Sequence, residues 1–171
     1  VTFTAKDNCS NEQTTSADIS ITDTTKPTFT VPADITIYKD ADCNYNSSTT
    51  ITGNVTDEID NCSRGIKATF TDVTSQGSCT GNLIITRTWS LQDDCGNITS
   101  KEQKITVEDT IAPIVNPIPD QKASVANCIF TVPDLTTLVR ANTSDNCTAN
   151  ANLSISQSPS AGTIITNLSN D

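Results

Sequence analysis

The sequence contains no histidine and no methionine, and only 4% of its 171 residues are aromatic. Without histidine, nucleophile systems of the Ser–His and Cys–His type are excluded, and a zinc site is disfavoured. No two of the seven cysteines have Cys-x-x-Cys spacing, which is a second argument against zinc. The acidic residues lie in turns beside Asn and Gly, where a cleft for a glycosidase-type acid pair is not expected. We therefore expect that the chain is not an enzyme.

Basic residues are scarce, and long apolar runs are absent. Ten Lys and Arg against twenty Asp and Glu give a formal net charge of −10, which argues against a nucleic-acid partner because phosphates would be repelled. No apolar run approaches the length of a membrane span, so we expect no membrane insertion. Seven cysteines in so acidic and Thr-rich a chain favour an oxidising, extracellular setting.

The chain repeats itself. The stretch Trp89–Pro113 (WSLQDDCGNITSKEQKITVEDTIAP) matches Phe3–Pro27 (FTAKDNCSNEQTTSADISITDTTKP) without a gap, at an offset of 86 residues. Two further matches have an offset of 85 residues: Cys128 with Cys43, and Asp145-Asn146-Cys147 with Asp60-Asn61-Cys62.

These matches predict three parts. Residues 1–25 are read as the last two strands of a preceding repeat, residues 26–110 as a complete repeat, and residues 111–171 as a following repeat that lacks its last two strands. Val1 already lies within a strand pattern, so we expect the sequence to be a segment of something longer. Either the array continues beyond both ends, or the first strands complete a neighbouring chain's domain by strand addition.

Alternating β-branched residues predict an all-β fold. Residues 1–6 read as a half-buried strand, and a second strand is expected around Ile19 and Ile21. The complete repeat has strand patterns at Ile35–Tyr38, Thr49–Val55, Ile66–Asp72, Leu83–Gln92 and Lys104–Glu108. With no helical period of ten or more residues, we expect tandem immunoglobulin-like β-sandwich repeats of about 85 residues. Trp89, the only tryptophan, is the expected core anchor.

Several motifs together resemble a known group of modules. They stand in this chain as TWSLQDDCGN, ITVEDTIAP, VPADITI and TDEIDNC. In this combination they are similar to hyalin-repeat-like (HYR-like), immunoglobulin-like repeats of large secreted surface adhesins of Bacteroidota, including gliding-motility adhesins. The resemblance implies an extracellular, cell-surface array whose partners are neighbouring repeats or chains of the same protein, or surface glycans. Two positions depart from the pattern: Ile164 replaces the cysteine expected from Cys79, and Ser10 replaces Gly96.

The cysteines allow two pairing schemes. In a sandwich of this strand order, the loops that hold Cys62 and Cys95 lie at the same end, so the preferred pairs are Cys62–Cys95 and Cys43–Cys79. The alternative pairs are Cys43–Cys62, Cys128–Cys147 and Cys79–Cys95. A strand of about eight residues at about 3.3 Å each separates Cys43 from Cys62, which disfavours the alternative. Sequence alone leaves the connectivity open.

Acidic residues gather in two loops and one joint of the predicted repeat. Calcium prefers six to eight oxygen ligands, which clustered carboxylates and carbonyls supply. The candidate calcium ligands are Asp23, Asp57, Asp60, Asp93 and Asp94. The competing interpretation is that acidic turn residues cap turns and solvate loop tips. The matching loop of the next repeat weakens the calcium hypothesis, because it contains only Asp145.

Two functions fit these features. The first is a structural segment, a stalk or filament, of a large secreted repetitive adhesin or extracellular fibre. The second is a carbohydrate- or partner-binding module that uses the Asp57–Cys62 and Asp93–Asn97 loops. These loops contain no aromatic residue for stacking on sugars, which favours the first. The resemblance also makes Thr24 and Thr110, which follow Asp in the joints, candidate O-glycosylation sites.

Overall fold

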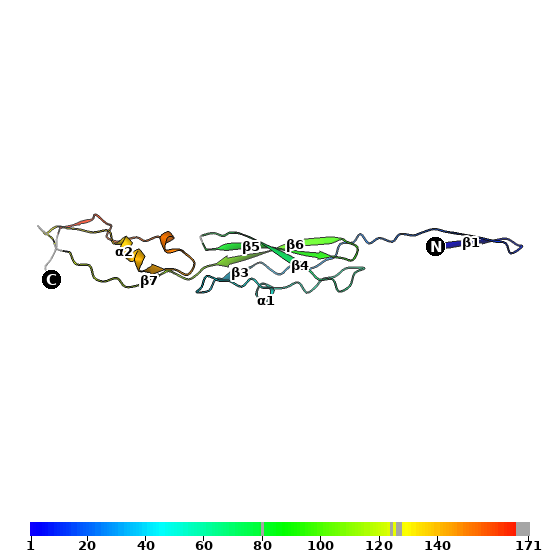
Figure 1. Ribbon diagram of the computed structural model, residues 1–171, viewed down its shortest axis with the longest axis horizontal. Coiled ribbons are helices and arrows are strands. Elements are labelled where there is room, and N and C mark those ends of the chain that lie inside the picture. The colour runs from blue at the N-terminus through cyan, green and yellow to red at the C-terminus, as the bar shows by residue number, and fades with distance from the viewer. Residues whose placement is uncertain (80, 124, 126–127, 167–171) are drawn as a thin grey trace. The chain divides into compact units, whose positions relative to one another are not determined.

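The computed structural model describes residues 1–79, 81–123, 125 and 128–166, and its fold is β-rich (Figure 1). Its strands are β1 (Thr2–Lys6), β2 (Glu12–Ser16), β3 (Ile35–Tyr38), β4 (Thr69–Gln76), β5 (Leu83–Gln92), β6 (Ile98–Glu108), β7 (Ile114–Val115), β8 (Phe130–Thr131), β9 (Thr143–Ser144) and β10 (Ile164–Ile165). The helices among the described residues are short: α1 (Thr49–Thr52), α2 (Thr136–Ala141) and a 3-10 turn, Asn150–Asn152. The β-rich class expected from the alternating pattern is confirmed.

The largest sheet has the strand order β3-β6-β5-β4. Strand β3 runs parallel to β6, with Ile35 opposite Ile105 and Tyr38 opposite Glu108. Three two-stranded antiparallel sheets pair β1 with β2, β7 with β9, and β8 with β10. The described residues divide into two compact units: unit 1 lies in Val1–Val31, Val55–Thr71 and Thr88–Glu102, and unit 2 in the described parts of Pro32–Asn54, Asp72–Arg87 and Gln103–Asp171.

Unit 1 is built on a small aromatic and aliphatic core. Trp89 is 1% exposed and packs with Phe29, Val55 and Leu91. The ring of Phe70 lies 5.0 Å from the ring of Trp89, centroid to centroid, in a tilted arrangement. The prediction that Trp89 anchors a core is confirmed.

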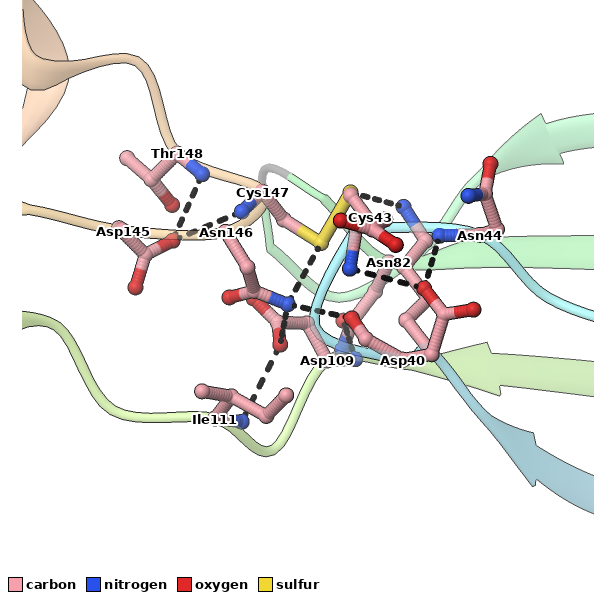
Figure 2. The surroundings of a disulfide bond; sticks show 12 residues. Asp40, Cys43, Asn44, Asn82, Asp109, Ile111, Asp145, Asn146, Cys147 and Thr148 are labelled. Atoms are coloured by element: carbon pink, nitrogen blue, oxygen red, sulfur yellow. Dashed lines mark hydrogen bonds between the residues drawn. A yellow bond between two sulfur atoms is a disulfide. The ribbon is translucent and has the colours of Figure 1, made fainter.

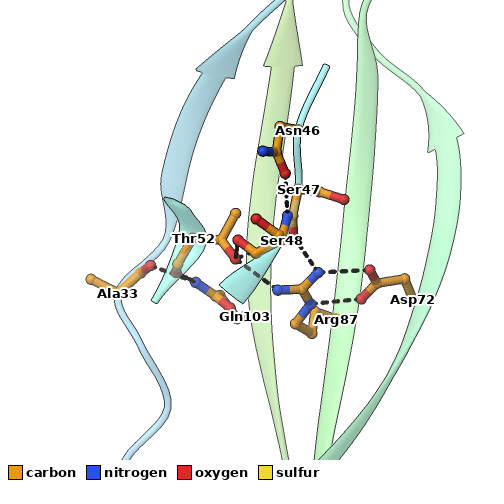
Figure 3. Close-up of polar contacts among 8 residues, drawn as sticks. All are labelled: Ala33, Asn46, Ser47, Ser48, Thr52, Asp72, Arg87 and Gln103. Atoms are coloured by element: carbon orange, nitrogen blue, oxygen red, sulfur yellow. Dashed lines mark hydrogen bonds and ion pairs between the residues drawn. The ribbon is translucent and has the colours of Figure 1, made fainter. Parts of the chain in front are cut away.

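Unit 2 combines an aliphatic core with a buried polar network. Its core contains Ile37, Ile85, Ile105 and Val107. Arg87 lies on the same face of β5 and is 1% exposed. The alternating pattern of the strand predicts an apolar residue at this position. Because a buried guanidinium needs partners for its five N–H groups, the surrounding chain supplies acceptors from several segments (Figure 3).

The acceptors of Arg87 come from β4, α1 and the segment before α1. Its Nε and Nη2 donate to the two carboxylate oxygens of Asp72, both at 2.8 Å. Its Nη1 donates to Thr52 Oγ1 and its Nη2 to the carbonyl of Ser47, both at 2.7 Å. Gln103, fully buried, donates to the carbonyl of Thr52 at 2.7 Å. This network holds α1 against the sheet.

Not every predicted strand forms. Ile35–Tyr38 and Leu83–Gln92 are strands with the expected bounds, but Thr49–Val55 is not a strand, because α1 occupies Thr49–Thr52. The hydroxyl of Thr52 donates back to the carbonyl of Ser48 at 3.1 Å, so it has a partner within the turn.

At the N-terminus, β2 covers Glu12–Ser16, whereas Ile19 and Ile21 lie outside any strand and are 69% and 94% exposed. The first strand is exposed along its whole length rather than half-buried. The antiparallel register pairs Thr2 with Ser16, so β2 ends before Ile19. The exposure arises because β1 and β2 form a two-stranded ribbon whose faces no other described segment covers.

Candidate functional site

The turn Asp93–Asn97 is built by its first side chain. Asp93 Oδ1 accepts hydrogen bonds from the main-chain N–H of Cys95 at 2.9 Å and of Asn97 at 2.7 Å, and Asp93 Oδ2 accepts one from Asn97 Nδ2 at 2.7 Å. Gly96 adopts a left-handed φ of 91°. These bonds explain why Asp, Gly and Asn stand at these positions, and they give Asp93 a structural role in addition to any ligand role.

The same turn forms 86 residues earlier. Asp7 Oδ1 accepts from the N–H groups of Cys9 and Asn11, both at 2.8 Å, and Asp7 Oδ2 accepts from Asn11 Nδ2 at 2.7 Å. Ser10 has a left-handed φ of 70°. The replacement of glycine by serine therefore changes the residue but not the turn.

Three carboxylates converge in unit 1. Asp23, Asp60 and Asp93 each place an oxygen within 4.8 Å of the others. Asp60 Oδ2 accepts from the N–H groups of Cys62 at 2.9 Å and Ser63 at 2.8 Å, which fixes the loop. Asp60 Oδ1 and Asp23 Oδ2 are buried and have no hydrogen-bond partner among the described residues. Buried acceptors without partners are costly, and hard cations bind oxygens of this kind.

Hydrogen bonds keep two of these carboxylates ionised. The pKa of Asp23 lies below its ordinary value, mainly because its carboxylate accepts from the main-chain N–H of Thr25. Desolvation raises the pKa of Asp93, but the hydrogen bonds from Asn97 and Cys95 outweigh it, and the net shift is downward. At neutral pH the cluster therefore carries negative charge at short range, which a cation would neutralise.

The other two predicted calcium ligands lie outside this cluster. Asp57 Oδ1 accepts from the main-chain N–H of Thr30 at 2.9 Å, so this carboxylate closes a different loop. Asp94 is exposed, and its main-chain N–H donates to Ser63 Oγ at 2.9 Å. The structure thus brings together three of the five candidates, each from a different turn or joint.

A disulfide joins Cys43 to Cys147, with Cα atoms 5.1 Å apart (Figure 2). The predicted Cys43–Cys79 pair is therefore wrong, and so are the alternative pairs that used Cys43 or Cys147. Cys62, Cys79 and Cys95 are free thiols, so the predicted Cys62–Cys95 bond and the alternative Cys79–Cys95 bond are not formed either.

The physical reason lies in the contacts of Asn146. Its Nδ2 donates to the carbonyl of Asp40 at 2.9 Å and to Asp109 Oδ1 at 3.2 Å, which holds the loop before Cys147 against the turn that presents Cys43. All of the predicted pairs lie within one repeat, whereas the observed bond joins residues assigned to two repeats. The recurrence of Asp-Asn-Cys beside each Asp-Thr joint was the available signal.

Thr24 and Thr110, the candidate glycosylation sites, are both exposed. In the part of the chain that the structure describes, no helix has the length and apolar character that crossing a membrane requires. Comparisons with protein-family models, with curated proteins and with solved structures return no match.

Proposed function

We propose that this chain is a structural segment, a stalk or filament, of a large secreted cell-surface adhesin, built from tandem immunoglobulin-like β-sandwich repeats of about 85 residues. The observation that carries this proposal is the Cys43–Cys147 disulfide, which ties residues assigned to the second repeat to residues assigned to the third. Hydrogen bonds support the same connection: Asn82 Oδ1 accepts from the N–H of Asp109 at 2.9 Å, and Asp109 in turn accepts from Asn146.

A joint of this kind suits a load-bearing array. The disulfide spans 104 residues, and the chain-entropy relation gives a stabilisation of about 4.7 kcal/mol for a loop of that size. Pro113 restricts the main chain immediately after the Asp109 turn. Covalent closure beside a stiff linker limits bending between consecutive repeats, which is what a stalk requires and what a catalytic domain does not.

Electron microscopy of tandem copies tests the proposal. We expect rods whose length increases in equal steps with the number of copies, and a broader distribution of bend angles when Cys43 and Cys147 are replaced by serine. Compact particles, or rods whose flexibility is unchanged in the serine variant, would contradict a stiff array held by this joint.

We further propose that the cluster of Asp23, Asp60 and Asp93 binds one calcium ion. The support is the pair of buried, partnerless oxygens on Asp23 and Asp60. Thermal unfolding at increasing calcium concentration tests this: a ligand that binds only the folded state stabilises it by about 2.7 kcal/mol at one hundred times its Kd. Asp60→Asn should abolish the increase in Tm, whereas the control Asp94→Asn should retain it. An unchanged wild-type Tm at millimolar calcium would refute the proposal.

The carbohydrate-binding alternative has less support. A cavity of about 370 Å³ next to the Asp57–Cys62 loop is lined by residues between Glu58 and Ile66, none of which is aromatic. We therefore expect that the chain binds no glycan specifically on a glycan array. A glycan that binds reproducibly, and no longer binds when Arg64 of this cavity is substituted, would support the alternative.

A further inference from the structure

The joints at Asp23 and Asp109 share one local geometry. We call the first joint the Asp23 turn with the Asp60–Ser63 loop, and the second joint the Asp109 turn with the Asp145–Thr148 loop. In each loop the Oδ2 atom of the aspartate accepts from the main-chain N–H groups two and three residues further on. These distances are 2.9 and 2.8 Å in the first joint and 3.1 and 2.7 Å in the second. The two loops are therefore folded in the same way.

The asparagine that follows each loop aspartate also has matching partners. Asn61 Nδ2 donates to Asp23 Oδ1 at 3.4 Å and to the sulfur of the next residue at 3.0 Å. Asn146 Nδ2 donates to Asp109 Oδ1 at 3.2 Å and to the sulfur of the next residue at 3.4 Å. The cysteines of the two joints are therefore placed alike against their turns.

The second joint holds one more element, which we call the Cys43 turn (Asp40–Asn44). Its first residue builds it, because the Asp40 carboxylate accepts from two main-chain N–H groups of the turn, at 3.0 and 2.8 Å. Cys43 has a left-handed φ of 63°. Two bonds hold the turn to the joint, as Figure 2 shows: Asn146 Nδ2 donates to the carbonyl of Asp40 at 2.9 Å, and Cys147 forms the disulfide with Cys43.

The first joint has the same groove without such a turn. The groove of the second joint has a volume of about 260 Å³ and is lined by Ala41 of the Cys43 turn and by six residues of the joint. The groove of the first joint has a volume of about 280 Å³, and its lining matches those six residues at positions 85 or 86 earlier in the chain: Thr25, Lys26, Thr28, Ile59, Asp60 and Asn61. Among the described residues, no counterpart of Ala41 lines it.

The exposure of the two loops differs in the way that a missing partner requires. Asn146 and Cys147, which bind the Cys43 turn, are half-buried. Asn61 and Cys62 are exposed, and Cys62 is a free thiol. The first joint therefore presents the groups that hold a turn in the second joint, and it presents them to solvent.

The position of the cysteine distinguishes the Cys43 turn from two other turns of the same kind. The turns that begin at Asp7, Asp40 and Asp93 each have an aspartate that accepts from the N–H groups two and four residues further on. In each, the residue three positions after the aspartate is left-handed. Only in the Asp40 turn, of these three, is that residue the cysteine, since Cys9 and Cys95 stand one position earlier. Because a disulfide requires a specific direction and spacing of the two Cβ atoms, the two kinds of turn are not interchangeable as partners.

We propose that the first joint is a docking site for a turn of the Cys43 type carried by another repeat of the same array, and that Cys62 forms a disulfide with the cysteine of that turn. The inference rests on the proposed array and names the partner of this surface. The partner has the pattern Asp-x-x-Cys-Asn with a small second residue, since Ala41 lines the second groove. Its aspartate presents a main-chain carbonyl to Asn61, as Asp40 does to Asn146.

The disulfide forms by two thiol–disulfide exchanges. The Cys62 thiolate attacks glutathione disulfide, forms a mixed disulfide and releases one glutathione thiolate. The thiolate of the docked cysteine then attacks Cys62 Sγ and releases the second glutathione thiolate. In sum, two protein thiols are oxidised to one disulfide, and one glutathione disulfide is reduced to two glutathione molecules, which take up the two protons.

An extended chain tests the proposal. Placing a copy of residues 26–86 directly before Val1 puts Phe3 where Trp89 stands in the complete repeat, and it supplies a Cys43 turn at nearly the natural separation from Cys62. In the added copy, Cys62 and Cys79 are replaced by serine. In the original 171 residues, Cys9, Cys79 and Cys128 are replaced by serine, and Cys95 is kept as a competitor for Cys62.

Peptide mapping after oxidation in a glutathione redox buffer reads the result. Trypsin releases Asp40–Arg64 as one peptide, and the serine at position 62 of the added copy gives its peptide a distinct mass. We expect the added Cys43 to be bonded to the original Cys62. The original Cys43 should be bonded to Cys147, which is an internal control that the chain has folded and oxidised.

Two further variants separate docking from random oxidation. Moving the added cysteine back by one position, with Asp42→Cys and Cys43→Ser, should abolish the bond, because the cysteine then stands as Cys95 does in its own turn. Ile59 lines the first groove and is 65% exposed, so Ile59→Arg in the original residues fills the docking space without disturbing a core. We expect it to slow formation of the bond about tenfold, because the clash opposes docking, whereas Ile59→Val should retain the rate.

Three results would overturn the proposal. The first is an original Cys62 that stays a thiol in chains that have formed Cys43–Cys147. The second is a Cys62–Cys95 peptide, and the third is an undiminished bond from the displaced cysteine or from Ile59→Arg. Rod length in electron microscopy is a separate measurement: rods that grow in equal steps, together with any of these results, would retain the array and reject the docking.

Discussion

Removal of Asp72 should destabilise the fold more than removal of both Asp72 and Arg87. The guanidinium of Arg87 is 1% exposed, whereas the Asp72 side chain is 27% exposed. Losing one partner of a buried ion pair costs about 3–5 kcal/mol, because the remaining charge stays buried. The partial exposure of Asp72 admits some water, so we expect Asp72→Ala to lower the free energy of unfolding by about 3 kcal/mol, at the low end of that range.

The double variant Arg87→Met/Asp72→Leu removes both charges and keeps the side-chain volume. Thr52 Oγ1 still donates to the carbonyl of Ser48, so its hydroxyl stays bonded. The carbonyl of Ser47 loses its 2.7 Å bond from Arg87 and keeps only the 3.4 Å contact with Thr52 Oγ1, which costs about 1–2 kcal/mol. We therefore expect the double variant to be more stable than Asp72→Ala, although it carries the larger change.

Urea unfolding at 25 °C, followed by the fluorescence of the single tryptophan, measures both variants. Trp89 is 1% exposed in the folded chain, so its emission should shift on unfolding. The control is Glu12→Ala, which removes an ion pair with Lys6 whose side chains are 49% and 54% exposed; it should cost less than about 0.5 kcal/mol. A cost below about 1 kcal/mol for Asp72→Ala, or a double variant less stable than Asp72→Ala, would refute the reasoning.

Three further predictions concern the joints. Cys147→Ser should lower stability towards urea by up to about 4.7 kcal/mol, the chain-entropy value for its loop, whereas Cys79→Ser should change little, since that thiol is free and exposed. Because the folded pKa of Asp93 is below 3.8, its contribution to stability should be complete above about pH 4 and lost as the pH falls through the folded pKa, so Asp93→Asn should flatten the acid limb of the stability curve. In chain purified from its native source, we expect O-glycans at Thr24 and Thr110, and an intact mass equal to that of the bare sequence would exclude them.

The sequence pattern predicted correctly those strands and turns whose conformation depends on neighbouring residues. The alternation from Leu83 to Gln92 gives a strand with the expected bounds, because every second side chain faces a core and a one-residue shift would expose all of them. The turn at Asp93 was predictable for a similar reason: one Asp side chain satisfies its own N–H groups. In contrast, Thr49–Thr52 has β-branched residues typical of a strand and still forms α1, since Arg87 and Gln103 bind this segment from the sheet.

The disulfide could not be derived from spacing. Cys43 and Cys147 are 104 residues apart, and no local propensity reports on a contact at that separation. The available signal was the internal repeat. The Asp-Asn-Cys loop recurs beside each Asp-Thr joint, so the hydrogen bonds made by one of these loops predict those of the other. The expectation that two loops and a joint lie at one end of the repeat placed Asp23 and Asp60 near Asp93, but it gave no reason to exclude Asp57, whose carboxylate accepts from the main-chain N–H of Thr30 instead.

Many of the acidic residues behind the net charge of −10 serve to form turns and are not evidence of ligand binding. Asp7, Asp40 and Asp145 each accept main-chain N–H groups in a turn or loop, and their charge is a consequence of using Asp as the turn-forming residue. Overall acidity is therefore weak evidence for calcium. The first joint differs because three such carboxylates meet there with two partnerless oxygens, and among the described residues no second group of three acidic side chains comes as close. Calcium binding by this chain should accordingly saturate at one ion per molecule, as isothermal titration calorimetry would measure, and a stoichiometry of two would mean that a joint with fewer acids also binds the ion.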